Sequence, residues 1–245
     1  MNDGSPSLYG DQPQTPRPKA PGLMEQIVGV FTEPGALFER LNQSPSWGWA
    51  VGLLTGLSVV MTVAWGLKVD VDEMMRPILE RNPKIDSAQI DTIIEMQKKF
   101  MLPFGVLGAL FGTILIVLII AFLFWLVGRF QAEQEKPSFL QALSATAVPG
   151  LVRIPSLLLI TLICLVKPIG GLTPEKIAPT SLGYFIQVGN LKLQAMLYSL
   201  DLFFLANLAL GYLALRKTMR MKTAGALLCT FVIVLLTVGG RALGA

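Results

Sequence analysis

The stretch from Pro103 to Gly128 carries no charged side chain and consists mainly of Leu, Ile, Val, Phe, Ala and Gly. A helix that is apolar on all sides is stable in a membrane or deep inside a large protein. At a rise of 1.5 Å per residue, about 20 such residues cross the hydrocarbon core of a bilayer. The stretch therefore predicts a membrane-spanning helix that is long enough to tilt.

Four further segments share this apolar character: residues 47–67, 140–166, 198–215 and 224–240. Trp47, Trp49 and Trp65 stand at the two ends of the first of them, where Trp commonly anchors a span at the membrane surface. The whole chain is 53% hydrophobic and 15% charged, whereas soluble domains carry about 25% charged residues. We therefore predict an all-α, polytopic membrane bundle with five transmembrane helices over residues 47–245.

Two short segments precede the first span. Residues 1–21 are rich in Pro, Ser, Gln and Gly, and predict a disordered tail because they cannot bury a core. Residues 22–46 carry two apolar stripes at helical spacing, which predict amphipathic helices in the membrane interface. The alternative is that these helices pack on the bundle or on a partner. The predicted interfacial side chains are Leu23, Ile27, Phe31, Leu37 and Phe38.

Two of the connections are long. Residues 68–102 predict a helical hairpin outside the membrane, with a break at Asn82 and a cap at Asp86 or Ser87; a solvated charged loop is the alternative. The connection over residues 167–197 is punctuated by Pro and Gly. A helix is expected to begin near Asn190 and to continue into the fourth span.

Five spans place the two termini on opposite sides of the membrane. The turn at residues 216–223 holds four cations and no acid, which is the pattern of a cytoplasmic loop. It predicts a cytoplasmic amino terminus and an outside carboxy terminus. The six cations in residues 68–102 weigh against this orientation, although seven acids accompany them.

Little in the sequence predicts catalysis. The chain has no His, the commonest general base and metal ligand. Cys164 and Cys229 both lie in apolar runs and are expected to be buried fillers. We find no metal-ligand motif, phosphate-binding loop or nucleophile–base pair, so we predict no enzyme activity, no cofactor and no metal. A net charge of +4 without basic–aromatic clusters also argues against nucleic-acid binding.

Arg153 and Asp201 are the only Asp, Glu, Lys or Arg residues inside the predicted spans, where charges are costly and commonly functional. At 1.5 Å per residue, Arg153 lies about 20 Å and Asp201 about 5 Å below the outer span ends. This mismatch disfavours an ion pair unless Pro149 and Pro155 break the third span. Asp201 is expected near the first turn of its helix, and Arg153 at a broken helix or in a polar pocket.

Uncharged residues in the spans suggest helix contacts. Asn207 is a candidate for a hydrogen bond between helices. Glycines spaced four residues apart permit close approach of two helices, although glycine is also simply common in spans. The candidate packing glycines are Gly48, Gly52, Gly56, Gly108 and Gly112.

The order of these features resembles the Yip domain family, named for Ypt/Rab-interacting proteins, in its prokaryotic form. "VFTEPGALFERLNQSPSW" leads into the first span, "PSFLQALSATAVPGLVRIPSLLL" opens the third, and "LYSLDLFFLANLALGYLALRKTMRMKTAGALL" carries the fourth through its basic turn into the fifth. The matching positions are Pro34, Phe38, Glu39, Leu41, Pro45, Phe139, Ala142, Leu143, Asp201, Phe203 and Gly211. Asn207 departs from the pattern, which commonly has an aromatic residue there.

The resemblance implies a five-span helical protein with a cytoplasmic amino terminus and no known catalysis. Eukaryotic relatives act in early secretory traffic and contact Rab GTPases; we do not transfer that partner, because the short tail shows no feature that would bind a GTPase. We expect a non-enzymatic protein that organises or scaffolds a membrane or a membrane complex. Its expected partners are membrane lipids and other membrane proteins or a second copy. The alternative is a transporter, or its accessory subunit, with a polar cavity near Arg153 and Asp201.

Overall fold

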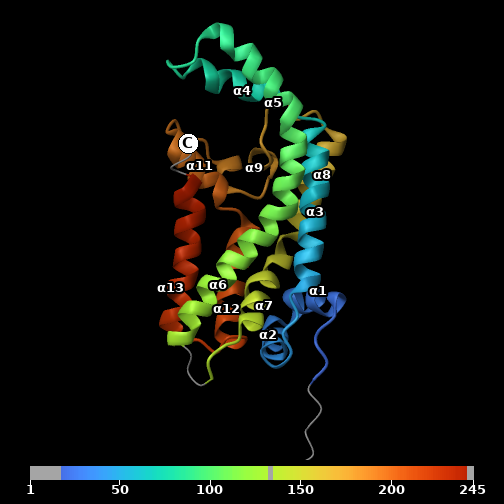
Figure 1. Ribbon diagram of the computed structural model, residues 1–245, viewed down its shortest axis with the longest axis vertical. Helices are drawn as coiled ribbons and strands as arrows, with labels where there is room; N and C mark the ends of the chain where they lie inside the picture. Colours follow the sequence, from blue (N-terminus) through green and yellow to red (C-terminus); the bar gives the residue numbers. More distant parts are fainter. Residues whose placement is uncertain (1–17, 132–134, 242–245) are drawn as a thin grey trace, which may run out of the picture.

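The computed structural model describes residues 18–131 and 135–241. Every regular element within these ranges is a helix, which confirms the all-α class. Figure 1 shows an elongated bundle whose long helices follow one axis. Most of the predicted tail at residues 1–21 lies outside the described residues.

Three helical stretches are long and apolar enough to cross a membrane: Gly48–Gly66, Ser87–Gln131 and Phe139–Val166. The second begins well before the predicted start at Pro103, because the helix that precedes Pro103 runs on through it. The apolar stretch Thr223–Gly239 is shorter.

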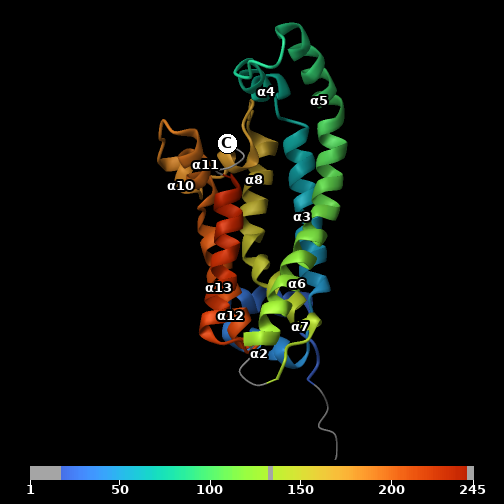
Figure 2. The same cartoon turned by 60° about the vertical axis from the view of Figure 1, so that its left-hand side comes forward.

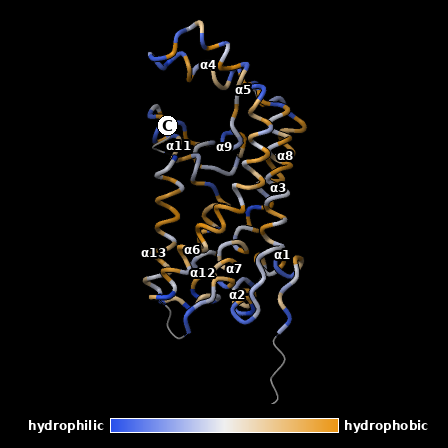
Figure 3. Tube along the Cα trace, viewed as in Figure 1, coloured by the Kyte–Doolittle hydropathy of each residue, from blue (hydrophilic) through white to orange (hydrophobic). Residues whose placement is uncertain are grey.

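The long axis is followed by α3 (Gly48–Gly66), α5 (Ser87–Leu107), η1 (Gly108–Gly112), α6 (Thr113–Gln131), α7 (Phe139–Ala147), η2 (Pro149–Arg153), α8 (Ile154–Val166), α12 (Leu202–Lys217), α13 (Thr223–Val234) and η3 (Leu235–Gly239). In Figures 1 and 2, α2 and the turn between α12 and α13 lie at one end, called here the α2 end. The hairpin of α4 and α5 lies at the other, the α4 end. Figure 3 shows hydrophobic residues concentrated between these two ends.

The helix α2 (Pro34–Gln43) turns its apolar face into the protein. Leu37, Phe38 and Leu41 are 3%, 0% and 0% exposed and belong to the main core together with Leu215. The prediction that Leu37 and Phe38 lie in the lipid interface is therefore wrong. The apolar stripe is real, but the bundle covers it instead of lipid.

Polar contacts fix α2 to the end of α12. The Asn42 side chain donates to the Thr218 carbonyl oxygen at 2.7 Å, and the buried Thr218 hydroxyl donates to the Phe38 carbonyl oxygen at 2.9 Å. Lys217 Nζ contacts Glu39 Oε1 at 2.5 Å, and this hydrogen bond lowers the pKa of the Glu39 carboxyl below its ordinary value. These contacts join segments far apart in the sequence, so α2 is an integral part of the bundle.

The helix α1 (Leu23–Thr32) is covered on one side only. Val30 is buried, and Ile27 is half-buried against the core. On the outer side Met24, Val28 and Phe31 are 70%, 53% and 51% exposed. This outer face, called here the α1 stripe, follows helical spacing and is available to lipid. The half-buried Leu23 adjoins it.

The α4 end carries the predicted helical hairpin. Asp70 caps α4 (Val71–Glu80), and Asp86 caps α5 through the Ala88 amide. Arg76 bridges the two helices by contacting Asp72 at 2.6 Å and Asp91 at 2.8 Å. The hairpin also has a small apolar core, formed by Leu79, Ile90 and Ile94.

Short helices connect α8 to α12: α9 (Pro174–Ile177), α10 (Leu182–Phe185) and α11 (Leu191–Ser199). The helix α11 begins after Asn190 as predicted, but it ends at Ser199 and does not continue into α12. The Leu182 amide donates to the Leu200 carbonyl at 2.9 Å, and the Leu202 amide donates to the Thr180 carbonyl at 3.1 Å. These bonds hold the backbone around Asp201 in an extended form, which interrupts the helix.

The candidate packing glycines face open space within the described chain. No atom of a neighbouring element lies within 4 Å of where a Cβ would stand on Gly48, Gly52, Gly56, Gly108 or Gly112. Their role in helix packing remains a prediction. Close approach occurs instead at other glycines: a Cβ on Gly66 would meet Leu102, one on Gly105 would meet Thr62, and one on Gly150 would meet Leu54.

The Thr218→Val substitution tests the attachment of α2. It removes the buried hydroxyl that donates to Phe38, and we expect the free energy of unfolding to fall by about 1 kcal/mol. The measurement is the denaturation midpoint of the purified protein in detergent. The control is Thr32→Val, which removes an exposed hydroxyl bonded within its own helix. An equal loss in both variants would contradict the assigned role of Thr218.

Candidate functional site

The third predicted span is broken in its middle. The α-helix α7 gives way to the 3₁₀ helix η2, and Pro155 lies in the first turn of α8. Pro has no amide hydrogen, and its ring crowds the carbonyl four residues earlier. Within η2, Leu151 and Val152 are buried, whereas Arg153 at its end is exposed. The break therefore presents Arg153 away from the core that holds its neighbours.

Arg153 lines a cavity of about 210 Å³, called here the Arg153 cavity. Its walls come from α3, α6, α7 with η2, α8 and α12. Its polar lining consists of Ser58, Thr113, Thr146, Arg153 and Asn207, and the remaining lining is apolar.

The cavity lies at mid-depth along the bundle. Ser58 stands about 15 Å from the start of α3 at 1.5 Å per residue. By the same rise Asn207 is about 9 Å from Asp201, the N-cap of α12, and Arg153 is about 20 Å from the end of α8. A charge at this depth costs about 2.5–3.5 kcal/mol or more when it faces hydrocarbon, so the polar lining has a physical reason.

The polar groups in the cavity have few partners. The hydroxyls of Thr113 and Thr146 donate to the carbonyls of Ala109 and Ala142, both at 2.8 Å. Asn207 Oδ1 is buried and has no hydrogen-bond partner among the described residues. The Arg153 side chain makes no hydrogen bond or ion pair with any residue that the structure describes. No carboxylate lines the cavity, so the guanidinium has no compensating negative charge there.

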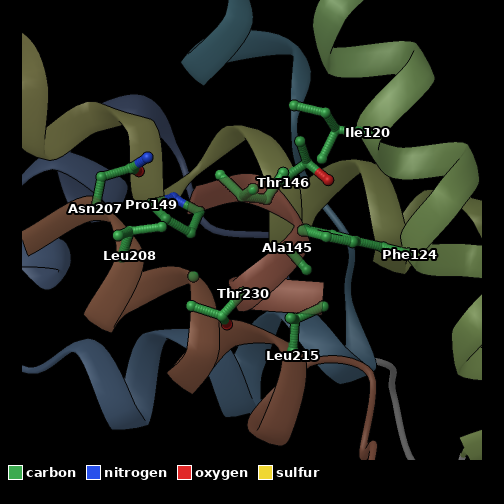
Figure 4. A pocket seen from close by; sticks show the side chains of 11 residues that line it. Ile120, Phe124, Ala145, Thr146, Pro149, Asn207, Leu208, Leu215 and Thr230 are labelled. Carbon is green, nitrogen blue, oxygen red and sulfur yellow. The ribbon is translucent and has the colours of Figure 1, made fainter. Parts of the chain in front are cut away.

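A second, smaller cavity of about 70 Å³ adjoins the first (Figure 4). It shares Ile120, Thr146 and Asn207 with the Arg153 cavity and adds Thr230 from α13. The Thr230 hydroxyl donates to the Ala226 carbonyl at 2.9 Å. Asn207 therefore lines both cavities. The predicted hydrogen bond from Asn207 to another helix is not found among the described residues.

Asp201 lies elsewhere, at the start of α12. Its Oδ1 accepts from the Phe204 amide at 2.7 Å, so it is the N-cap of that helix. Asp201 is not among the residues that line the Arg153 cavity, and no ion pair joins it to Arg153 in the described chain. Arg153 and Asn207 thus line the same cavity. Asp201 lies at the start of its helix, as the sequence predicted.

The arrangement offers binding chemistry and little acid–base chemistry. The Arg153 cavity contains no carboxylate or thiol. The described residues also include no group of three or more His, Cys, Asp or Glu that could hold a metal ion.

Sequence reasoning missed Thr146 and Gly150 as residues that line the Arg153 cavity. Their spacing from Arg153, at i, i+4 and i+7, is the helical signal that would have grouped them.

Comparison with known proteins gives one match. The model of the Yip1 domain family covers residues 28–242, which is most of the chain. No curated protein and no solved structure was found to match. The family model extends over both the attachment of α2 and the Arg153 cavity.

Two substitutions at Asp201 separate a capping role from a charge role. Asp201→Ala removes the acceptor for the Phe204 amide, and we expect a loss of about 1 kcal/mol in the free energy of unfolding. Asp201→Asn keeps a capping oxygen and should cost only a few tenths of a kcal/mol, since Asn and Asp cap about equally well. Denaturation midpoints in detergent give both values. If Asn proves as damaging as Ala, the negative charge matters and the capping role is insufficient.

Proposed function

Because the chain belongs to the Yip1 domain family, we propose that it is a multi-pass membrane protein without catalytic activity that organises a membrane or a membrane protein complex. The observation that carries this proposal is the α1 stripe. Met24, Val28 and Phe31 form an exposed apolar face at the α2 end, on a helix fixed to the bundle. A helix of this kind lies in the interface plane and inserts its apolar face among the lipid headgroups and upper acyl chains.

Rigid attachment distinguishes this helix from a loose anchor. The wholly buried Gln26 donates to the Pro21 carbonyl at 2.9 Å and to the Ser46 hydroxyl at 2.9 Å. The Gln141 side chain donates to the Asn42 carbonyl at 2.7 Å, which ties α2 to α7 as well as to α12. These contacts fix the position of α1 relative to the bundle. Insertion of the α1 stripe would therefore act as a wedge that spreads the lipids of one leaflet.

Two further crossings are part of the proposal. The helix α12 has 16 residues and Thr223–Gly239 has 17, which correspond to about 24–26 Å at 1.5 Å per residue. This is a few ångströms less than a typical hydrocarbon core of about 30 Å, a mismatch that bilayers absorb by local thinning. Both helices follow the bundle axis beside the longer ones (Figures 1 and 2). Together with the three long stretches they give five crossings.

We place the α2 end in the cytoplasm. The turn between α12 and α13 brings Arg216, Lys217, Arg220 and Lys222 to this end, and short loops rich in Lys and Arg favour the cytoplasmic side. Each such cation near an anionic leaflet contributes about 1 kcal/mol of attraction. The α1 stripe and the basic turn therefore favour the same leaflet. Lipids of that leaflet, together with other membrane proteins or a second copy, are the proposed partners.

The Arg153 cavity is the observation that favours the alternative, an accessory subunit of a transport complex. A proton path needs several titratable groups in sequence, whereas this cavity holds one permanent cation. The organising function is therefore preferred.

Substitution of the α1 stripe tests the proposed wedge. Met24, Val28 and Phe31 changed together to Gln should leave the fold intact, because all three are exposed. Reconstituted at a fixed protein-to-lipid ratio, the wild type should form vesicles of smaller mean diameter than empty lipid, and the variant should not. The control is Ile78→Gln, an exposed apolar residue on α4. Equal diameters for wild type and variant would remove the main support for a wedge.

Cysteine labelling tests the side assignment. Lys176→Cys, on α9, should react with a membrane-impermeant maleimide in intact cells, whereas Lys222→Cys, before α13, should react only after permeabilisation. The parent chain is the control, since its Cys164 and Cys229 are buried. The opposite pattern would reverse the orientation. Labelling of both in intact cells would exclude a crossing by α12.

A further inference from the structure

We propose that the Arg153 cavity binds one oxyanion, a carboxylate or a phosphate ester, carried on an apolar chain. This proposal concerns a site in the middle of the bundle and is independent of the α1 stripe. It rests on the charge of the cavity, its lining and its opening.

The charge of the cavity is positive and uncompensated. The Arg153 side chain has no hydrogen bond or ion pair with a described residue, and no carboxylate lines the cavity. The guanidinium presents several donors in a planar fork that matches carboxylate and phosphate oxygens. An oxyanion is therefore the ligand that this side chain recognises best.

The polar lining would position such a group. The Thr113 and Thr146 hydroxyls are already committed as donors to their own helices, so they offer little to an anion beyond weak dipoles. Asn207 is different, because its buried Oδ1 has no partner among the described residues. The Asn207 amide lines the cavity and carries two N–H donors, which would bind a second oxygen of the ligand when the amide is oriented with its nitrogen toward it.

The apolar lining and the opening of the cavity indicate a ligand with a chain. Leu54, Ile116 and Leu157 line the cavity beside Arg153. Ile116 is also 58% exposed, so the cavity reaches the outer surface of α6. A charged head at Arg153 with an apolar tail along Ile116 would leave no charge in hydrocarbon. A volume of about 210 Å³ accommodates a head group, whereas the tail would lie outside.

The test is native mass spectrometry of the full-length protein released from neutral detergent. Phosphatidylglycerol is added as the anionic lipid, phosphatidylcholine as the zwitterionic one. We expect the wild type to retain one phosphatidylglycerol that Arg153→Gln binds about tenfold more weakly. The matched control is Arg81→Gln, which removes one positive charge at the end of α4, outside the cavity. It should bind like the wild type.

Two further variants keep the test informative if Arg153→Gln fails to fold. Ser58→Leu narrows the cavity from α3 while Arg153 remains, and it should also weaken phosphatidylglycerol binding. Arg153→Lys keeps the charge and should retain more binding than Arg153→Gln. Unchanged phosphatidylglycerol binding in both Arg153→Gln and Ser58→Leu overturns the proposal, as does an equal loss of phosphatidylglycerol binding in Arg81→Gln.

Competition with inorganic phosphate identifies the source of the ligand. If millimolar phosphate does not displace phosphatidylglycerol, the site takes its ligand from the bilayer. If phosphate displaces the lipid from the wild type, the site also takes small oxyanions from water. Both results support an oxyanion site at Arg153, provided that the signal is lost in Arg153→Gln.

Discussion

Hydrocarbon supplies no hydrogen bonds, and this constraint governs the whole structure. Backbone amides and carbonyls that face lipid must pair within the protein, which leaves the helix as the available form for an open chain. Side-chain hydroxyls obey the same constraint: those of Thr113, Thr146, Thr161 and Thr230 each donate to the carbonyl four residues earlier. Polar side chains that lack such a partner are therefore informative. In the middle of the bundle they include Asn207 and Arg153, which line the same cavity.

The same constraint explains which predictions were correct. Long apolar runs predict helices that are long and apolar enough to cross a membrane, because a helix is the form that satisfies the backbone in hydrocarbon; the stretch around Pro103–Gly128 is an example. The proline break near Arg153 was also readable, since a missing amide hydrogen has a local effect. The length of α5 was not, because Pro usually marks a break or the first turn of a helix, whereas α5 runs through Pro103. Five crossings remain a proposal for α12 and Thr223–Gly239.

Predictions about what covers a surface failed more often. The apolar stripes of α1 and α2 look alike in sequence, yet Phe38 is fully buried and Phe31 is half exposed. Hydropathy records that a face avoids water and does not record whether lipid or protein covers it. The glycine ladders show the same limit: Gly52 faces open space, whereas a Cβ on Gly150, outside the ladders, would meet Leu54. Contacts between distant segments, such as Asn42 with Thr218, leave no local signal at all.

The element that connects the two proposed sites is α12. Its first turn is capped by Asp201, its middle presents Asn207 to the cavity, and its last turn leads into Thr218, which holds α2. A helix is stiff along its axis, so a displacement at either end is carried to the middle. Insertion of the α1 stripe into a leaflet would act on α2 and through Thr218 on α12. An oxyanion bound between Arg153 and Asn207 would act on the same helix from its middle. Under the two proposals, lipid at the surface and a ligand in the cavity would therefore both act on α12, although the residues involved do not touch.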